Sequence, residues 1–345
     1  MTAPHPLVVR ARRLADDLLV PQAERVDQDG VPASHLAAVR ASGLLGINAP
    51  LAYGGSAVPA AVGRETAEIL AGACCSTWFV QTQHHTPVLT LVRGESTARE
   101  RLLGPLARGE LLSGVAYAHL RAYPRTPVTA TREAGGWRFD GTVPWYTGWG
   151  LNDVMLLAGV TGGGEAVFAF TEAREGPGLR ASEPMRLAAL SAARTVSLEL
   201  DGLRVPDAAV ALRTPYDRWA EGDRTKAVSA NPAVFGVAEA ALALLAPEHE
   251  DVAGPLRARL AEVRARAYAL ADHPVPSERL DERLAARVEA FEVLGAATTA
   301  AVVAGGGRAL ALTGRAQRLA REALFLLVQG QTRESRLAHL DVLAR

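Results

Sequence analysis

The segment RFDGTVPWYTGWGLNDVMLLAG, residues 138–159, combines the features that decide the fold. Its first residues alternate between polar and apolar side chains, and Asp140-Gly141 is a dipeptide that closes β-hairpins because glycine accepts a positive φ. We therefore predict a hairpin that turns at this dipeptide. Beyond it, two of the five tryptophans of the chain bracket Thr147 beside glycines, which let another molecule approach the backbone closely.

Short runs of the same kind extend on both sides of this segment, between about 112 and 212. They are rich in β-branched and aromatic residues, they are separated by glycine turns, and VSLEL at 196–200 alternates strictly. At least six such runs predict a small β-barrel or sandwich. No Gly-x-Gly-x-x-Gly motif opens a βαβ unit here, which argues against a Rossmann nucleotide site.

Helical patterns flank the β-rich region. The first part contains a helix at 32–43 that opens with proline and stops at glycine, and another that begins at the N-cap Ser96. After about 221, apolar residues recur at helical spacing, and the last such pattern, from Arg315 through Leu340, is long and amphipathic. Four helices joined by short loops predict a bundle. The predicted fold class is α+β, with an N-terminal helical domain (1–111), a central β-barrel (112–220) and a C-terminal four-helix bundle (221–345).

Composition narrows the possible partners. Lysine plus arginine and aspartate plus glutamate number 37 each, so no excess of charge favours nucleic acid or an acidic membrane surface. The two cysteines, Cys74 and Cys75, are adjacent and match no zinc pattern, which favours a reducing compartment. The N-terminus lacks the apolar core of a signal peptide, and we find no apolar run of the roughly 18 residues that span a membrane. We expect a cytoplasmic protein that binds neither nucleic acid, nor a membrane, nor a metal.

Four segments in this order resemble the acyl-CoA dehydrogenase superfamily of flavoproteins, and the resemblance covers nearly the whole chain. They are HLAAVRASGLLGINAPLAYGG (35–55), WRFDGTVPWYTG (137–148), ARTVSLELDGLRVPDAAV (193–210) and RLAREALFLLVQGQTRESRLAHL (318–340). The resemblance implies FAD as cofactor and a small-molecule substrate such as an acyl-CoA. It also implies assembly into a homodimer or homotetramer, or into a heteromer with a homologue.

The resemblance assigns cofactor contacts to several residues. Trp145 would lie against the isoalloxazine ring, and Thr147 would donate a hydrogen bond to its N5/O4 edge, where negative charge builds up on reduction. The alternative is an ordinary strand-end tryptophan in a barrel core. Gly305, Gly306 and Thr332 resemble nucleotide contacts from the bundle, although a glycine triplet also simply stops a helix.

The loop after the first β-strand departs from the family. GVAYAHLRAYPRTP replaces the usual Thr-Glu-Pro…Gly-Ser-Asp, so Ala118 and His119 stand where flavin contacts are expected. A histidine can donate to the ring and titrates near neutral pH, and Arg121 and Arg125 would pair with the pyrophosphate. Alternatively, His119 simply ends a strand at the surface.

The catalytic base departs as well. Dehydrogenation of a thioester needs a carboxylate at the α-carbon, and the family's two positions for it correspond to Gly330 and Lys226. The Arg-x-x-Phe-Gly segment that holds a neighbour's nucleotide is also missing. His84 and His85 are candidate catalytic residues, because related flavin monooxygenases carry a histidine in the corresponding helix. The alternative is one buried, hydrogen-bonded histidine and one exposed.

These features predict a flavin-dependent oxidoreductase of acyl-CoA dehydrogenase type that acts on an acyl thioester or a related small substrate without the usual glutamate. The alternatives are a non-catalytic subunit of a heteromeric dehydrogenase and a flavin-dependent monooxygenase of the same fold. The missing glutamate favours the alternatives, whereas the Trp145-Thr147 pair favours flavin.

Overall fold

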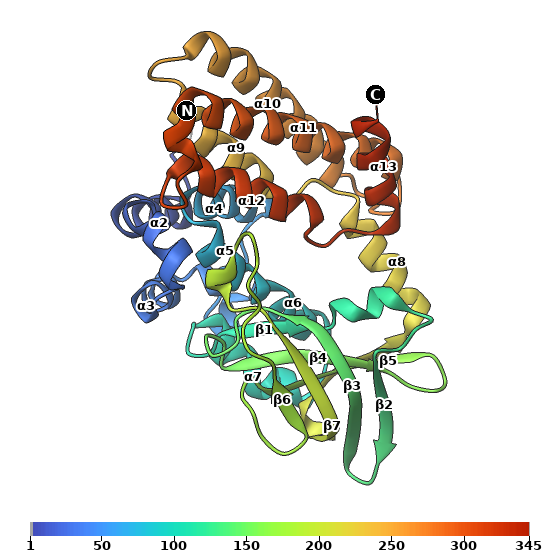
Figure 1. Ribbon diagram of the computed structural model, residues 1–345. Coiled ribbons are helices and arrows are strands. Elements are labelled where there is room, and N and C mark those ends of the chain that lie inside the picture. The colour runs from blue at the N-terminus through green and yellow to red at the C-terminus, as the bar shows by residue number, and fades with distance from the viewer. Residues whose placement is uncertain (1–2, 345) are drawn as a thin grey trace.

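The computed structural model describes residues 3–344 and changes its secondary structure twice along the chain. Helices extend to residue 107, strands run from 113 to 215, and helices follow from 216 to 343. In Figure 1 most helices of both ends of the chain lie together above the strands, whereas α6 (His85–Arg93) and α7 (Thr97–Ala107) lie at the level of the strands. The α+β class is as predicted, while the domain boundaries at 111 and 220 stay a prediction.

The first five N-terminal helices pack their apolar sides into one core that they share with the C-terminal bundle, whereas the last two pack against the sheet. Ser96 accepts a hydrogen bond from the backbone N–H of Arg99 (3.2 Å), which confirms the predicted cap. The predicted helix at 32–43 is also observed, and it ends before Gly43. The α-helices are α1 (Pro6–Leu14), α2 (Val20–Asp29), α3 (Ala33–Ala41), α4 (Ala60–Ala73), α5 (Cys75–Gln83), α6 (His85–Arg93) and α7 (Thr97–Ala107).

Eight strands form one mixed sheet in the order β6-β7-β3-β2-β4-β5-β8, with β1 paired to β4. The sheet bends around an apolar interior, and within the described chain its end strands β6 and β8 do not pair, so the predicted barrel is open. Helices α6 and α7 cover the outer face of β4 and β5. The strands are β1 (Ser113–Ala116), β2 (Val128–Glu133), β3 (Gly136–Tyr146), β4 (Val154–Val160), β5 (Glu165–Glu172), β6 (Leu179–Ala181), β7 (Val196–Pro206) and β8 (Val210–Pro215).

The predicted hairpin turn at Asp140-Gly141 is wrong. Strand β3 runs straight through this dipeptide, and the chain turns instead at Ala134-Gly135 between β2 and β3. Gly141 sits at an irregularity in the pairing of β3 with β7, with a φ of 126°. A Cβ there would come within 1.9 Å of the Pro127 carbonyl oxygen, so the glycine serves a bulge and a close strand contact rather than a turn.

The C-terminal region contains the predicted four-helix bundle. It is formed by α9 (Pro232–Leu245), α10 (Glu250–Ala271), α11 (Leu280–Gly305) and α12 (Arg315–Val328), which pack against one another. Helix α8 (Tyr216–Ala227) connects the sheet to the bundle, and α13 (Arg333–Leu343) follows α12. The amphipathic pattern predicted from Arg315 to Leu340 is therefore two helices, because the chain turns at Gly330, where φ is 64°.

Two helical stretches of the bundle region are long and apolar enough to cross a membrane by length and composition, contrary to the expectation that none would be. They are residues 216–245 and 280–310, and 61% and 44% of their most apolar windows are buried inside the protein. Core helices of a bundle pass the same test, so these stretches are weak evidence for a membrane span.

Candidate functional site

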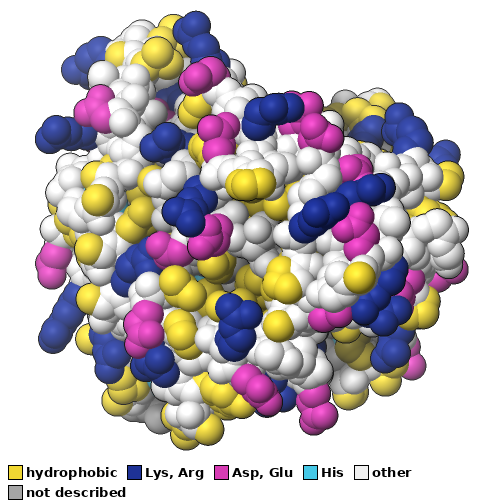
Figure 2. All heavy atoms as spheres, turned by 90° about the horizontal axis from the view of Figure 1, so that it is seen from below, with side chains coloured by type: hydrophobic (Ala, Val, Ile, Leu, Met, Phe, Trp, Pro, Cys, Tyr) yellow, Lys and Arg dark blue, Asp and Glu magenta, His cyan; other side chains and the backbone are white. Residues whose placement is uncertain are grey.

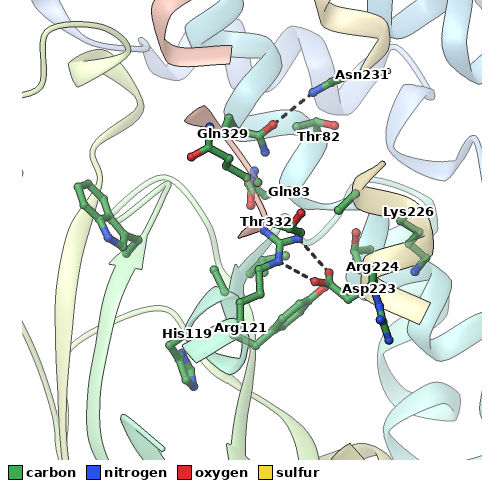
Figure 3. Close-up of a pocket in the computed structure, with 18 of the residues that line it drawn as sticks. Thr82, Gln83, His119, Arg121, Asp223, Arg224, Lys226, Asn231, Gln329 and Thr332 are labelled. Atoms are coloured by element: carbon green, nitrogen blue, oxygen red, sulfur yellow. Dashed lines mark hydrogen bonds and ion pairs between the residues drawn. The ribbon is translucent and has the colours of Figure 1, made fainter. Parts of the chain in front are cut away.

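A cavity of about 1910 Å³ lies where the three regions of the chain meet. Its walls come from α5 and α6, from the strand ends and the loop after β1, from α8, and from the loop that joins α12 to α13. Figure 3 shows side chains from these elements turned toward one another, with Arg121 joined to Asp223 and Asn231 joined to Gln329. The cavity is large enough for a dinucleotide-sized molecule with a second ligand.

The charge in the cavity differs from that of the chain. The chain has equal numbers of basic and acidic residues, and on the face that Figure 2 shows their side chains are interspersed. Among the described residues that line the cavity, the carboxylates are only Asp223 and Glu334. The lining cations are Arg93, Arg121, Arg125, Arg213, Arg218, Arg224, Lys226, Arg287, Arg321, Arg333 and Arg336. This excess of positive charge suits an anionic ligand.

Trp145 and Thr147, at the end of β3, lie in the cavity wall as predicted. Trp145 is 54% exposed, so it does not belong to the sheet core. The backbone beside it is fixed by Asn152, whose side-chain amide donates to the Thr147 carbonyl oxygen (3.1 Å) and to the Tyr146 hydroxyl (3.0 Å). A Cβ on Gly148 would come within 2.3 Å of this amide, which explains the glycine. An open indole face on a fixed backbone suits a planar ring.

Ala118, His119 and Arg125 also line the cavity, from the loop after β1. His119 is buried, and its Nε2–H donates to the Ala158 carbonyl oxygen (3.0 Å), which leaves Nδ1 unprotonated and without a hydrogen-bond partner within residues 3–344. Burial lowers the pKa of His119 to about 4. His119 is therefore neutral near pH 7, which does not fit the expectation of a histidine that is charged beside the flavin ring. Its burial does not fit the alternative expectation of a strand end at the surface.

Arg121 is already paired. Its Nε donates to Asp223 Oδ2 (2.6 Å) and its Nη2 to Asp223 Oδ1 (2.9 Å), which is a bidentate ion pair between the loop after β1 and α8. Both arginines line the cavity, so their pairing with the pyrophosphate stays a prediction.

The structure does not bring His84 and His85 to the cavity. His84 is fully buried, and its Nδ1 accepts a hydrogen bond from the Ser113 backbone N–H (3.1 Å). Burial, and then the neighbouring His85, lower the pKa of His84 to about 3. His85 Nε2 accepts from the Gln81 amide (2.7 Å), and burial lowers its pKa to about 4. The helix turns a different face, which includes Gln83, to the cavity, so this placement gives no support for a catalytic role of either histidine.

Of the three bundle residues predicted to contact the cofactor, only Thr332 lines the cavity. Gly305 and Gly306 end α11 outside the cavity lining, which fits the alternative that the glycines stop a helix. Thr332 does line the cavity, and its Oγ1 caps α13 by accepting from the Ser335 backbone N–H (3.3 Å). The cavity thus brings together Ala118, His119, Arg125, Trp145, Thr147 and Thr332.

Both expected positions of the catalytic base, Gly330 and Lys226, line the cavity, and neither offers a carboxylate. The sequence interpretation missed Gln329, directly before Gly330. Its Oε1 accepts a hydrogen bond from the Asn231 amide (3.3 Å), so a neutral amide occupies the cavity at this turn. Its position beside Gly330 was the signal that could have identified it.

Comparison with known proteins gives a family for one part of the chain and a fold for all of it. Residues 6–110 match the sequence model of the acyl-CoA dehydrogenase N-terminal domain. A search of curated protein sequences gave no match. Butyryl-CoA dehydrogenase from Megasphaera elsdenii superposes with a TM-score of 0.82 at 17% identity, over 98% of this chain and 97% of that one.

Two further solved structures are similar to the same extent. Dibenzothiophene monooxygenase from Paenibacillus sp. A11-2 has a TM-score of 0.80 at 19% identity, over 98% of this chain and 97% of that one. The FAD complex of PigA has a TM-score of 0.81 at 17% identity, over 98% and 96%. At these identities the likeness establishes the fold, which hosts both dehydrogenases and monooxygenases.

Proposed function

We propose that this chain, which has the acyl-CoA dehydrogenase fold, is an FAD-dependent oxidoreductase that acts on an acyl thioester or a related small substrate without the usual glutamate. The observation that carries the proposal is the open indole face of Trp145 in the wall of a cavity whose other walls are cationic. A flavin ring suits the indole, and a dinucleotide pyrophosphate suits the arginines.

The residues present fit the cofactor. Trp145 offers an aromatic face to the ring, Thr147 offers polar atoms beside it, and His119 keeps this wall neutral. Arg125 and the N-terminus of α13, capped by Thr332, suit the phosphates. When bound, FAD supplies the acceptor for a hydride or for electrons.

The proton chemistry is where the chain departs from a dehydrogenase. Both oxygens of Asp223 accept hydrogen bonds from Arg121, so this carboxylate is already paired. The amide of Gln329 does not accept a proton near neutral pH. The other carboxylate of the lining, Glu334, is exposed in the first turn of α13, so neither expected position of the base, Gly330 or Lys226, supplies a carboxylate for removal of an α-proton.

This shortage of carboxylates is also the observation that favours a second function. A flavin-dependent monooxygenase needs no base at a substrate α-carbon, and the fold is shared with dibenzothiophene monooxygenase. The absence of a carboxylate at the expected positions also fits a third function, that of a non-catalytic subunit that pairs with an active homologue.

The absorption spectrum of the purified protein tests the proposal. We expect flavin bands between about 350 and 500 nm, or a rise in melting temperature when FAD is added to colourless protein. A colourless protein that neither FAD nor FMN stabilises contradicts the proposal and leaves the non-catalytic reading. Bound flavin that gives hydrogen peroxide only with an external reductant, and that octanoyl-CoA does not bleach anaerobically, favours the monooxygenase.

Exposed apolar side chains on the last helices support self-association. Side chains that are more than half exposed include Leu337, Leu340 and Leu343 on α13, and Leu324 and Val328 on α12, which also line the cavity. Exposed apolar clusters of this kind are unfavourable in water and mark interfaces. We expect a homodimer or homotetramer, and a monomer by light scattering at micromolar concentration contradicts it.

A further inference from the structure

The bundle wall of the cavity contains a buried arginine that no carboxylate neutralises. Arg287, on α11, lines the cavity and is only 4% exposed. Its Nη1 donates to the Ser229 carbonyl oxygen (3.2 Å), and its guanidinium lies 5.1 Å from the centre of the Phe291 ring. Its Nε and Nη2 are buried, and neither has a hydrogen-bond partner within the described chain.

The two unsatisfied nitrogens have a defined geometry. Nε–H and one N–H of Nη2 point from the same edge of the planar guanidinium, and this edge matches the two oxygens of a carboxylate or phosphate. The opposite nitrogen, Nη1, is the one that the protein itself satisfies through Ser229. The unsatisfied part of the guanidinium is therefore the bidentate part, and it belongs to a residue that lines the cavity.

The ionisable groups around Arg287 do not compensate its charge. Burial, followed by repulsion from Arg121, lowers the pKa of Arg287 to about 10. His339, which faces it from α13, has its pKa lowered to about 4 by burial and by Arg287. Of the two carboxylates in the cavity lining, Asp223 is paired through both oxygens with Arg121, and Glu334 is exposed at the start of α13; neither forms an ion pair with Arg287. At neutral pH Arg287 therefore stays charged without a counter-ion from the described residues.

Another deeply buried arginine of the bundle is paired with carboxylates. Arg318, which is 2% exposed, donates from Nη1 to Glu322 (2.7 Å) and from Nε to Glu24 (3.2 Å). A buried charge without a partner is strongly unfavourable, so a protein retains one where a ligand supplies the partner.

We propose that Arg287 is the anion-binding residue of a substrate subsite, where its Nε and Nη2 take the two oxygens of a carboxylate or phosphate group carried by the substrate. The inference rests on the proposed function in one respect, because it takes the cavity to be the substrate site. It narrows the substrate class to molecules with an anionic group away from the reacting carbon.

Titration of the whole purified protein with glutarate and with inorganic phosphate tests this subsite, with sodium chloride at equal ionic strength as the control. We expect at least one of the two anions to raise the melting temperature and to bind with a measurable heat, while chloride does neither. Glutarate alone indicates a carboxylate, and phosphate alone a phosphate. If neither anion acts on the wild type beyond chloride, the proposal is wrong.

Variants separate an anion site from a structural arginine. Arg287→Met should melt at a higher temperature than the wild type without anion, because it removes an unpaired buried charge, and its anion affinity should fall at least tenfold. Arg283→Met is the matched control, since Arg283 lies one turn earlier, is also buried, does not itself line the cavity and donates to Ser229 and Pro276. It should lower the melting temperature and keep the anion response.

Two further measurements keep the test decisive. If Arg287→Met does not fold, Arg287→Lys keeps the charge but loses the bidentate edge, and its anion affinity should still fall. An unchanged response in the folded variant overturns the proposal. If saturation with FAD removes the anion response, the anion belongs to the cofactor and the substrate assignment is wrong. If the protein binds no flavin but its response to the anion depends on Arg287, the anion subsite is supported while the proposed flavin-dependent function is contradicted.

Discussion

Two walls of the cavity differ in their electrostatics. The sheet wall consists of the strand ends and the loop after β1, and the bundle wall consists of α11 and the loop that joins α12 to α13. On the sheet wall, Thr147 Oγ1 bonds to Thr195 Oγ1 (3.1 Å), and His119 is neutral. On the bundle wall, Arg287 is buried with two unsatisfied donor nitrogens, and Gln329 offers an amide beside Gly330, where a carboxylate was expected. The first wall suits a planar, largely neutral ring, and the second suits an anion but has no carboxylate at the expected position of the base.

The largest effect is expected from giving the bundle wall a base. Gln329→Glu keeps the side-chain shape and adds a carboxylate, so the rate of flavin reduction by octanoyl-CoA should rise by about 10²–10⁴, the usual contribution of a positioned base. The measurement is anaerobic stopped-flow bleaching of the flavin. Gln331→Glu, which adds the same charge to the same loop, is the control and should have little effect. If both variants bleach no faster than the wild type, the missing carboxylate is not what limits the reaction.

The neutral sheet wall should become unstable in acid. The pKa of His119 is depressed to about 4 in the folded state, below the ordinary value of 6.5, so the unfolded state binds the proton first. Its contribution to stability is complete above pH 6.5 and is lost as the pH falls toward 4, which amounts to about 2 kcal/mol at pH 5. In urea unfolding at pH 7.5 and 5.0, His119→Gln should lose about 2 kcal/mol less than the wild type between the two pH values. Equal losses in both proteins would show that His119 is not held neutral.

The sequence predicted the sheet wall better than the bundle wall, and the reason is physical. Trp145 and Thr147 lie at the end of β3, within a short continuous segment (137–148) that resembles the family, so the resemblance could assign them to the site from neighbouring residues. Arg287 lies inside an ordinary helical pattern, and nothing nearby in the sequence shows that its partners on other elements lack a carboxylate. Unpaired charge is a property of tertiary contacts, which local patterns do not contain.

The same limit explains two other outcomes. His84 and His85 share a helical segment with Gln83, and only the packing of that segment decides which face meets the cavity. Asp140-Gly141 reads as a turn locally, but the approach of Pro127 makes it a bulge within a long strand. Helix caps such as Ser96 were predictable because the hydrogen bond that defines them spans three residues.

A smaller effect is expected from the indole of the sheet wall. Trp145→Ala should weaken FAD binding by about 0.5–1.5 kcal/mol, the contribution of aromatic stacking beyond buried area. Trp149→Ala is the control, because Trp149 packs edge-on against Tyr146 and does not line the cavity. Equilibrium titration of the apoproteins with FAD, followed by fluorescence, should separate the two variants. A larger loss for Trp149→Ala would place the flavin elsewhere.

The smallest effect concerns the pair that joins the two walls. Arg121 reaches from the loop after β1 to Asp223 on α8, so Asp223→Asn leaves a second arginine near Arg287 without its counter-charge. Because both side chains are only partly buried, we expect the affinity for glutarate or phosphate to rise by about two- to fivefold, in the range of a solvent-screened ion pair.

Calorimetric titration measures this change, and Asp217→Asn is the matched control, since Asp217 lies on the same helix outside the cavity lining. If Asp223→Asn instead lowers anion affinity, the ion pair positions Arg121 for binding rather than neutralising it. Residues of both walls would then bind the anion. The two walls would still differ in their fit to the flavin ring and in the missing catalytic carboxylate, but not in their affinity for an anion.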